Sequence, residues 1–193
     1  MALMSSTELQ LSDEERRLLL ELAREAIRHG VRHGAPPRID LESLPPALRQ
    51  PRATFVTLED DGQLRGCIGS LEPRRPLAED VVHNAFAAAF GDPRFLPVRE
   101  DEVDRLKIHI SVLSPLEEIK AGSEAELLEQ IRPGVDGLVI AEGDLRGTFL
   151  PVVWQSLPDK KEFLRHLRVK AGLPPDYWSD TMKIYRYTTQ VIE

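Results

Sequence analysis

The pair Asp61-Gly62 constrains the fold more than any other feature of the sequence, because an Asp-Gly dipeptide between two strand-like runs is a strong β-hairpin signal. Residues 53–58 alternate in strand fashion before the pair, and residues 64–70 follow it with the sequence Leu-Arg-Gly-Cys-Ile-Gly-Ser. We call this second run the signature. The sequence predicts that the signature is the return strand of a hairpin.

Strand geometry places the only thiol of the chain beside a cation. Side chains alternate between the two faces of a strand, so Arg65, Cys67 and Gly69 are predicted to share one face. A neighbouring cation favours the thiolate, which is the form that attacks electrophiles or binds metals. We therefore interpret Cys67 and Arg65 as candidate catalytic residues. The alternative interpretation is that Cys67 is a small buried apolar residue and that Arg65 points to water.

Two glycines flank the thiol. Glycine weakens a strand, so Gly66 and Gly69 indicate either a bulge or a close approach by another backbone or a ligand. Because glycine has no side chain, the backbone around Cys67 is left uncovered, and its amide groups can bind an anion. The candidate ligand-binding residues are Gly66, Gly69, Ser70, Arg94 and Arg146.

Arg146 is included because part of the signature recurs later in the chain. Residues 62–66 read Gly-Gln-Leu-Arg-Gly and residues 143–147 read Gly-Asp-Leu-Arg-Gly, each after a predicted turn. We predict that Cys67 lies at the floor of a cleft between two lobes, with Arg65 in contact with it directly or through water. If the two hairpins share one geometry, Arg146 projects into the same cleft, and the two guanidiniums bind a phosphate or carboxylate. The alternative is a chance match, since hairpin turns recruit glycine.

Capping residues predict a first helix that starts after Ser12. Ser12 and Glu15 form a capping box, and an apolar stripe follows until Gly30, which is expected to end the helix. His29 and His33 stand four residues apart, which suits a metal on a helix, but Gly30 lies between them and no third ligand is near. We interpret both as surface residues, and the sequence predicts no metal site.

A second helix is predicted over residues 76–90, and it is apolar over much of its circumference, so we expect it to be buried. His83 would then be a buried imidazole that needs partners, either as a structural histidine or as a weak candidate for a catalytic base. The proline-bracketed turn at residues 92–97 follows. Its Asp92 could act as an acid or base, but acidic residues in loops are mostly solvated.

The remaining pattern predicts an α+β fold around a largely antiparallel β-sheet with packed helices. Residues 34–51 are rich in proline and aliphatic residues, which indicates a connector packed on the body of the protein. Additional strands are expected at 107–113, 137–141, 145–150 and 182–192, and additional helices after Ser123 and Asp159.

Composition excludes several classes of protein. A net charge of -7 argues against binding nucleic acid through a broad basic face. A single cysteine excludes an internal disulfide and any multi-cysteine metal site, and it fits the reducing cytoplasm. Residues 1–10 lack the pattern of a secretory leader and no run is long enough to cross a bilayer, so neither export nor membrane anchoring is predicted.

Taken together, the motifs resemble the AMMECR domain, known in bacteria and archaea as the AmmeMemoRadiSam system protein A family. The resemblance covers about residues 12–190, in order, and the Leu-Arg-Gly-Cys-Ile-Gly run is its most specific part. The segments that carry the resemblance are residues 64–71, 77–80, 87–90, 92–95, 110–114, 148–151 and 170–173.

The resemblance implies one cytosolic α+β domain over residues 1–193, in two lobes, with the signature near their junction. It also implies a Memo-like protein and a radical S-adenosylmethionine protein as neighbours. It does not identify a reaction, and the cofactor is unknown. This chain departs from the family pattern at Val152, where relatives often have glutamine, and at Arg168, where many have cysteine. Mechanisms that need that amide or second thiol are therefore in doubt for this chain.

Three functions from different classes follow. In the first, Cys67 is a reactive or carrier thiol of a modification system, with Arg65 favouring thiolate. In the second, the protein is a non-catalytic module that binds a small anionic ligand through Arg65, Arg146 and glycine amides. In the third, it is a scaffold for a partner, and the signature only holds the lobes together. The sequence does not decide whether the protein is an enzyme.

Overall fold

A computed structural model describes residues 9–193, so residues 1–8, on which the expectation about a leader partly rests, lie outside the described residues. The chain divides into two compact units. Unit 1 holds the described residues up to Ser114 together with Gln190–Glu193, and unit 2 holds Pro115–Thr189. Each unit is described by itself.

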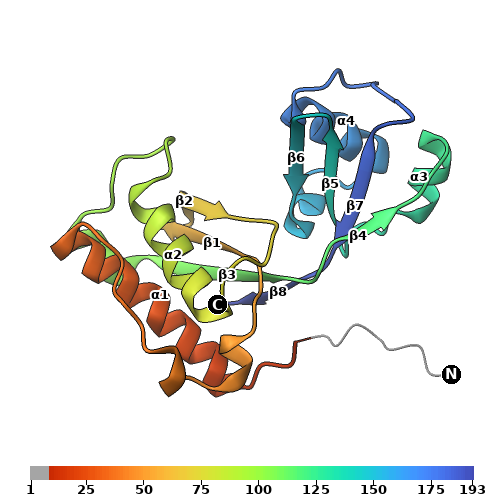
Figure 1. The fold of residues 1–193 in the computed structure, drawn as a ribbon. Helices are drawn as coiled ribbons and strands as arrows, with labels where there is room; N and C mark the ends of the chain where they lie inside the picture. Colours follow the sequence, from red (N-terminus) through yellow and green to blue (C-terminus); the bar gives the residue numbers. More distant parts are fainter. Residues whose placement is uncertain (1–8) are drawn as a thin grey trace, which may run out of the picture. The chain divides into compact units, whose positions relative to one another are not determined.

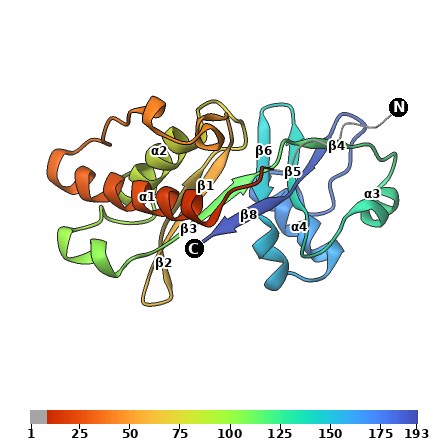
Figure 2. The ribbon, with the colours of Figure 1, turned by 90° about the horizontal axis from the view of Figure 1, so that it is seen from below.

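Unit 1 is a four-stranded sheet with helices α1 and α2 over it (Figures 1 and 2). The strand order is β2-β1-β3-β8, and the sheet is antiparallel. Its elements are α1 (Asp13–His33), η1 (Leu41–Ser43), η2 (Pro46–Arg49), β1 (Thr54–Asp60), β2 (Gln63–Gly69), α2 (Leu77–Phe90), η3 (Glu100–Arg105), β3 (Lys107–Leu113) and β8 (Thr189–Ile192).

Unit 2 contains the second antiparallel sheet, with the order β4-β7-β5-β6. The indole of Trp154 stacks on the Phe163 ring in its core, with centroids 3.7 Å apart. Its elements are β4 (Glu117–Ile119), α3 (Glu124–Gln130), β5 (Gly137–Glu142), β6 (Leu145–Phe149), η4 (Pro151–Gln155), α4 (Lys160–Ala171) and β7 (Lys183–Tyr187). The predicted α+β class is therefore confirmed.

The two sheets have the same topology and exchange their fourth strands. In each, a hairpin, a helix and a third strand follow one another: β1, β2, α2 and β3 in one sheet, and β5, β6, α4 and β7 in the other. Strand β4 follows β3 along the chain but pairs with β7, while β8 follows β7 but pairs in the sheet of β3. The prediction of one closing strand over residues 182–192 is wrong, because this segment contributes to two sheets.

Helix α1 begins as predicted but ends later. Ser12 accepts a hydrogen bond from the Glu15 amide at 3.1 Å, and the Glu15 carboxylate accepts one from the Ser12 amide at 2.8 Å. The helix passes through Gly30 and ends at Gly34, which has a φ of 68°. Gly30 is needed for packing instead, since a Cβ at this position would lie 2.3 Å from the Phe90 ring.

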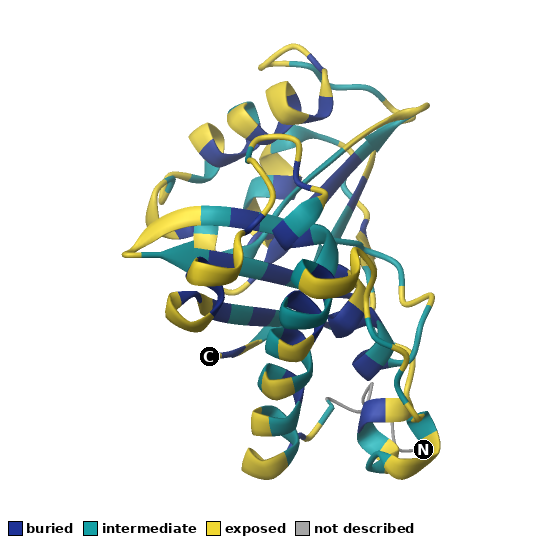
Figure 3. Cartoon of the chain, turned by 90° about the vertical axis from the view of Figure 1, so that its left-hand side faces the viewer, coloured by how far each residue is buried: buried dark blue, intermediate teal, exposed yellow. Residues whose placement is uncertain are grey.

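Helix α2 is held on β1 by buried polar groups. Thr54 Oγ1 donates to Asp80 Oδ2 at 2.7 Å, and Asn84 Nδ2 donates to the Thr54 carbonyl at 3.1 Å. His83 does not belong to this network, because it lies on the exposed side of the helix. The prediction of a buried His83 is therefore wrong: the helix has a solvent side despite its many apolar residues. Figure 3 maps burial on the cartoon, where helical turns alternate between buried and exposed.

The proline-rich segment 34–51 forms two short 3-10 helices. Leu48 is fully buried in the core of unit 1, and Leu41 and Leu44 pack against that core. The aliphatic residues of this segment thus contribute to the core that supports the signature.

Candidate functional site

A β-bulge sets the direction of the thiol. The hairpin turn has positive φ at Asp61 and Gly62, as the sequence predicts. Asp60 pairs with Gln63, but the register shifts after Glu59 and Leu64, and Leu58 pairs with Gly66. Arg65 is the extra residue. Beyond the shift, Cys67 pairs with Thr57 rather than with the fully buried Val56.

The two glycines are sites of close backbone approach, one of the alternatives that the sequence indicates. A Cβ at Gly66 would lie 2.1 Å from the carbonyl oxygen of Ala88 in α2. A Cβ at Gly69 would lie 2.4 Å from the carbonyl oxygen of Thr54 in β1. Helix α2 therefore rests directly on the strand at Gly66, and Cys67, one residue further, lies on the opposite face.

Side chains hold the main chain of Cys67 at the outer edge of β2. The Cys67 amide donates to Asp92 Oδ2 at 3.0 Å, and Arg94 Nη2 donates to the Cys67 carbonyl at 3.4 Å. Since both groups point away from β1, Cys67 and Thr57 form a non-hydrogen-bonded pair, in which side chains come closest. Thr57 Oγ1 accordingly donates to Cys67 Sγ at 3.2 Å.

Asp92 and Arg94 form a fixed ion pair beside the thiol. Arg94 Nε lies 3.0 Å from Asp92 Oδ1, and Arg94 Nη2 lies 2.7 Å from Asp92 Oδ2. The Asp92 side chain is 2% exposed, and its hydrogen bonds with Arg94, opposed in part by burial, hold the pKa of its carboxyl well below the ordinary range. The expectation of a solvated loop carboxylate is wrong. Asp92 is an anion that orients the strand.

One guanidinium nitrogen of Arg94 makes no hydrogen bond with the described residues. This atom is Nη1, and the Arg94 side chain is 55% exposed. The Asp92 hydrogen bond, opposed in part by burial, raises the pKa of Arg94 above its ordinary value. Arg94 is thus a permanent cation near the thiol with one guanidinium nitrogen still available.

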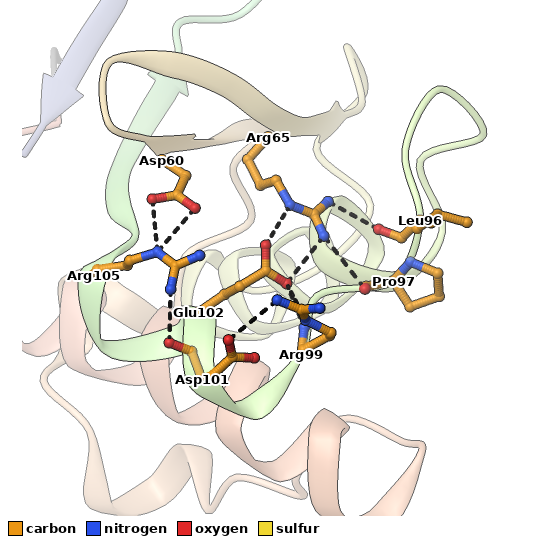
Figure 4. A network of polar contacts seen from close by, with 8 residues as sticks. All are labelled: Asp60, Arg65, Leu96, Pro97, Arg99, Asp101, Glu102 and Arg105. Carbon is orange, nitrogen blue, oxygen red and sulfur yellow. Dashed lines mark hydrogen bonds and ion pairs between the residues drawn. The ribbon is translucent and has the colours of Figure 1, made fainter.

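Arg65, in contrast, has its guanidinium engaged (Figure 4). Its Nε donates to Glu102 Oε1 at 3.0 Å, and its Nη1 donates to the Leu96 carbonyl at 2.8 Å. Its Nη2 reaches the Pro97 carbonyl and Glu102 Oε2, both at 3.3 Å. Arg65 lowers the pKa of the Glu102 carboxyl. None of the contacts that the described residues give Arg65 goes to the sulfur, so it links β2 to the segment after α2.

The other candidates lie around this centre. The Ser70 amide donates to the Thr54 carbonyl at 3.1 Å. His83 lies on the exposed side of α2, where partial burial and then the Arg75 charge lower its pKa. No contact between His83 and Cys67 is present in the described part of the chain. His83 thus remains a weak candidate, outside the cluster around the thiol.

Arg146 lies on β6 in unit 2, opposite Ala141 of β5. Its hairpin shares one feature with the first, which is a glycine packed directly against a helix. A Cβ at Gly147 would lie 2.9 Å from Ala171 of α4, as a Cβ at Gly66 would meet Ala88 of α2. The turns differ, because here Gly143 is the first loop residue. The prediction that Cys67 lines a cleft between lobes that Arg146 shares stays a prediction.

The two departures from the family pattern are also in unit 2. Arg168 is 1% exposed; it donates to the Pro175 carbonyl at 2.9 Å and to Glu124 at 2.6 Å. Val152, in contrast, is exposed. At position 168 the chain therefore has a buried arginine that forms an ion pair between α4 and α3 with the partly exposed Glu124.

Sequence reasoning missed Thr57 and Glu102, and it interpreted Asp92 as a solvated loop residue. Thr57, Asp92 and Glu102 touch the thiol, its backbone and Arg65, respectively. The spacing of Asp92 and Arg94 was a usable signal for an ion pair. Nothing in the local pattern indicated Thr57 or Glu102, since the first depends on the bulge and the second is 37 residues from Arg65.

Comparison with known proteins identifies relatives over nearly the whole chain. Residues 20–192 match the AMMECR1 family. A protein of Methanothermobacter thermautotrophicus is 42% identical over 187 residues, which is 94% of this chain and 95% of that protein. A Methanocaldococcus jannaschii protein is 44% identical over 164 residues, covering 81% and 80% of the two chains. A crystal structure of an uncharacterized Pyrococcus horikoshii protein matches with a TM-score of 0.87 and 37% identity, covering 94% and 92%.

No helix among residues 9–193 is both long and apolar enough to span a membrane. The same residues contain no group of three or more histidine, cysteine and acidic side chains placed to hold a metal ion.

Proposed function

The chain belongs to the AMMECR1 family, and we propose that it works in a modification system in which Cys67 is a reactive or carrier thiol. The other components would be a Memo-like protein and a radical S-adenosylmethionine protein, and the compartment would be the cytoplasm. The observation that carries the proposal is the position of Cys67, a partly exposed thiol whose sulfur and main chain are both held by neighbouring side chains.

In this role the sulfur would attack an electrophilic carbon. A carbon–sulfur bond forms, the leaving group departs with the electron pair of the bond that breaks, and the thiol proton passes to solvent. A fixed nucleophile reaches its target at a smaller entropic cost than a mobile one. Asp92 and Arg94 fix the main chain of Cys67, and Arg65 fixes the strand two residues before it. These three are positioning residues in the proposal.

Alkylation tests the reactivity of the thiol. Cys67 should react with iodoacetamide at neutral pH faster than the thiol of a short peptide with the sequence of the signature. Mass spectrometry of the intact protein reports the rate, and a Cys67→Ser variant checks that no other group reacts. A rate far below that of the peptide would overturn the proposal and favour a structural cysteine.

Co-expression tests the carrier role. The protein would be produced with its Memo-like and radical S-adenosylmethionine neighbours, and its intact mass would be compared with that of protein produced without them. We expect an added mass that peptide mapping assigns to Cys67 and that is absent from Cys67→Ser. An unchanged mass would count against the carrier, and an added mass elsewhere would make this chain a substrate of another kind.

A second candidate function is the binding of a small anion beside the thiol. The supporting observation is Arg94, whose Nη1 atom has no hydrogen-bond partner among the described residues. An arginine with free donors suits a carboxylate or phosphate. Calorimetry with inorganic phosphate and succinate should give heat for the native chain and for Arg99→Gln, but not for Arg94→Gln. No heat from any protein would exclude this candidate and leave partner docking.

A further inference from the structure

We propose that His29 and His33 form a chelating pair for a divalent transition-metal ion such as Zn²⁺ at the carboxyl end of α1. The sequence argued against a metal here for two reasons: Gly30 lies between the two histidines and was expected to end the helix, and no third ligand is near. The helix instead continues to His33. Residues four apart on a continuous helix lie on the same face, one turn from each other.

The two rings are close enough to share an ion. Their centroids are 4.3 Å apart, and their planes are tilted by 43°. Zinc binds imidazole nitrogen at roughly 2.0–2.1 Å, so two nitrogens on one tetrahedral ion lie about 3.3 Å apart. The exposed His33 ring would have to turn about its side-chain bonds to bring its nitrogen to that distance from the His29 ring.

The contacts of His29 leave a ligand atom available. Its Nδ1 lies 2.7 Å from the carbonyl oxygen of Ala35. A carbonyl oxygen only accepts, so Nδ1 carries the proton and Nε2 carries the lone pair of the neutral ring. A metal-binding histidine characteristically donates its other N–H to a carbonyl or carboxylate in this way.

The surroundings suit a weakly held cation. His33 is exposed, and its ring nitrogens have no hydrogen-bond partner in the described part of the chain. The helix carboxyl end carries partial negative charge, which favours a cation, while neighbouring Arg32 opposes it. No third side chain among the described residues completes the site. The pair therefore supplies two ligands and water supplies the rest.

Zinc titration tests the pair. We would use a Cys67→Ser background, because thiolates bind zinc, and follow calorimetry together with the imidazole resonances by NMR. We expect one ion, with the resonances of His29 and His33 moving at the same zinc concentration. His29→Gln and His33→Gln should each weaken binding at least tenfold. His166→Gln is the matched control, since this exposed histidine lies four residues from Glu162 on α4 and has no histidine partner there.

Binding that survives both substitutions, or two resonances that move at separate zinc concentrations, would overturn the proposal. Loss of fold does not confuse the result, because His33 is exposed and circular dichroism reports the helix content of each variant. The reactivity of Cys67 plays no part in this test, so the outcome is independent of the proposed function.

Discussion

The hydroxyl of Thr57 donates a hydrogen bond to the sulfur of Cys67 across the β1–β2 pair, at 3.2 Å. This contact exists because the bulge at Arg65 moves Cys67 opposite Thr57. A hydroxyl donor stabilises negative charge on its acceptor. The residue across the strand is therefore part of the environment in which the thiol reacts.

Thr57→Val should slow alkylation of Cys67 by iodoacetamide, because it removes this donor and keeps the shape of the side chain. A hydrogen bond contributes about 0.5–1.5 kcal/mol, which corresponds to about two- to tenfold in rate. Thr57→Ser keeps the hydroxyl and should react like the native chain. Equal rates in all three proteins would show that the contact does not tune the thiol.

Asp92→Asn should destabilise the protein at neutral pH by about 1–3 kcal/mol, because a charged acceptor of the Cys67 amide and of Arg94 is lost. The pKa of Asp92 is lower in the folded state than in the unfolded chain. Its stabilisation is therefore complete above the ordinary carboxyl range and is lost as the pH falls.

Urea unfolding at pH 7, 5 and 3 measures this effect. The difference between Asp92→Asn and the native chain should be largest at pH 7 and smaller at pH 3. Asp101→Asn is the control, since its exposed carboxylate should change stability by less than about 0.5 kcal/mol. A difference that stays constant with pH would contradict the assigned role of the charge.

Arg65→Ala should cost about 3 kcal/mol, because it leaves the nearly buried Glu102 carboxylate without its main partner. The double variant with Glu102→Gln should recover part of this loss, which a double-mutant cycle in urea measures. We also expect Arg65→Ala to slow alkylation of Cys67. An unchanged alkylation rate together with a large loss of stability would make Arg65 purely structural.

Gly66→Ala should destabilise the protein by about 1–3 kcal/mol, since its methyl group would meet the rigid backbone of α2. Gly122→Ala offers a control, because its nearest neighbour is a flexible glutamate carboxylate at 3.4 Å. The midpoint of urea unfolding should fall for the first variant and hardly move for the second. Similar midpoints would mean that α2 shifts away from the strand at little cost.

Local signals were enough to predict most of the elements. Caps, turn residues and periodicity located both hairpins, β3 and the four α-helices, because these depend on neighbours in the sequence. The end of α1 was missed because the glycine at position 30 is required by packing against Phe90, which is distant in the sequence, and not by the end of the helix. The split of residues 183–192 was missed because nothing local distinguishes a strand that serves two sheets from one that serves a single sheet.

The site illustrates the same limit at the level of single residues. Without the bulge, the register set by the turn would pair Cys67 with Val56 and turn the thiol into the core. The glycines indicated a bulge as one alternative, but they did not specify the residue that it would displace. A shift of one position thus decides between a buried cysteine and a partly exposed one.

The exchange of strands has a consequence for how the chain is made. Strand β7 lies between β4 and β5 in one sheet, and β8 is the fourth strand of the other. Neither sheet can therefore be completed until residues 183–192 have been synthesised. Until that segment leaves the ribosome, β3 keeps an open edge, which in a nascent chain invites aggregation. We therefore expect both cores to be acquired together once this segment is available, rather than one after the other.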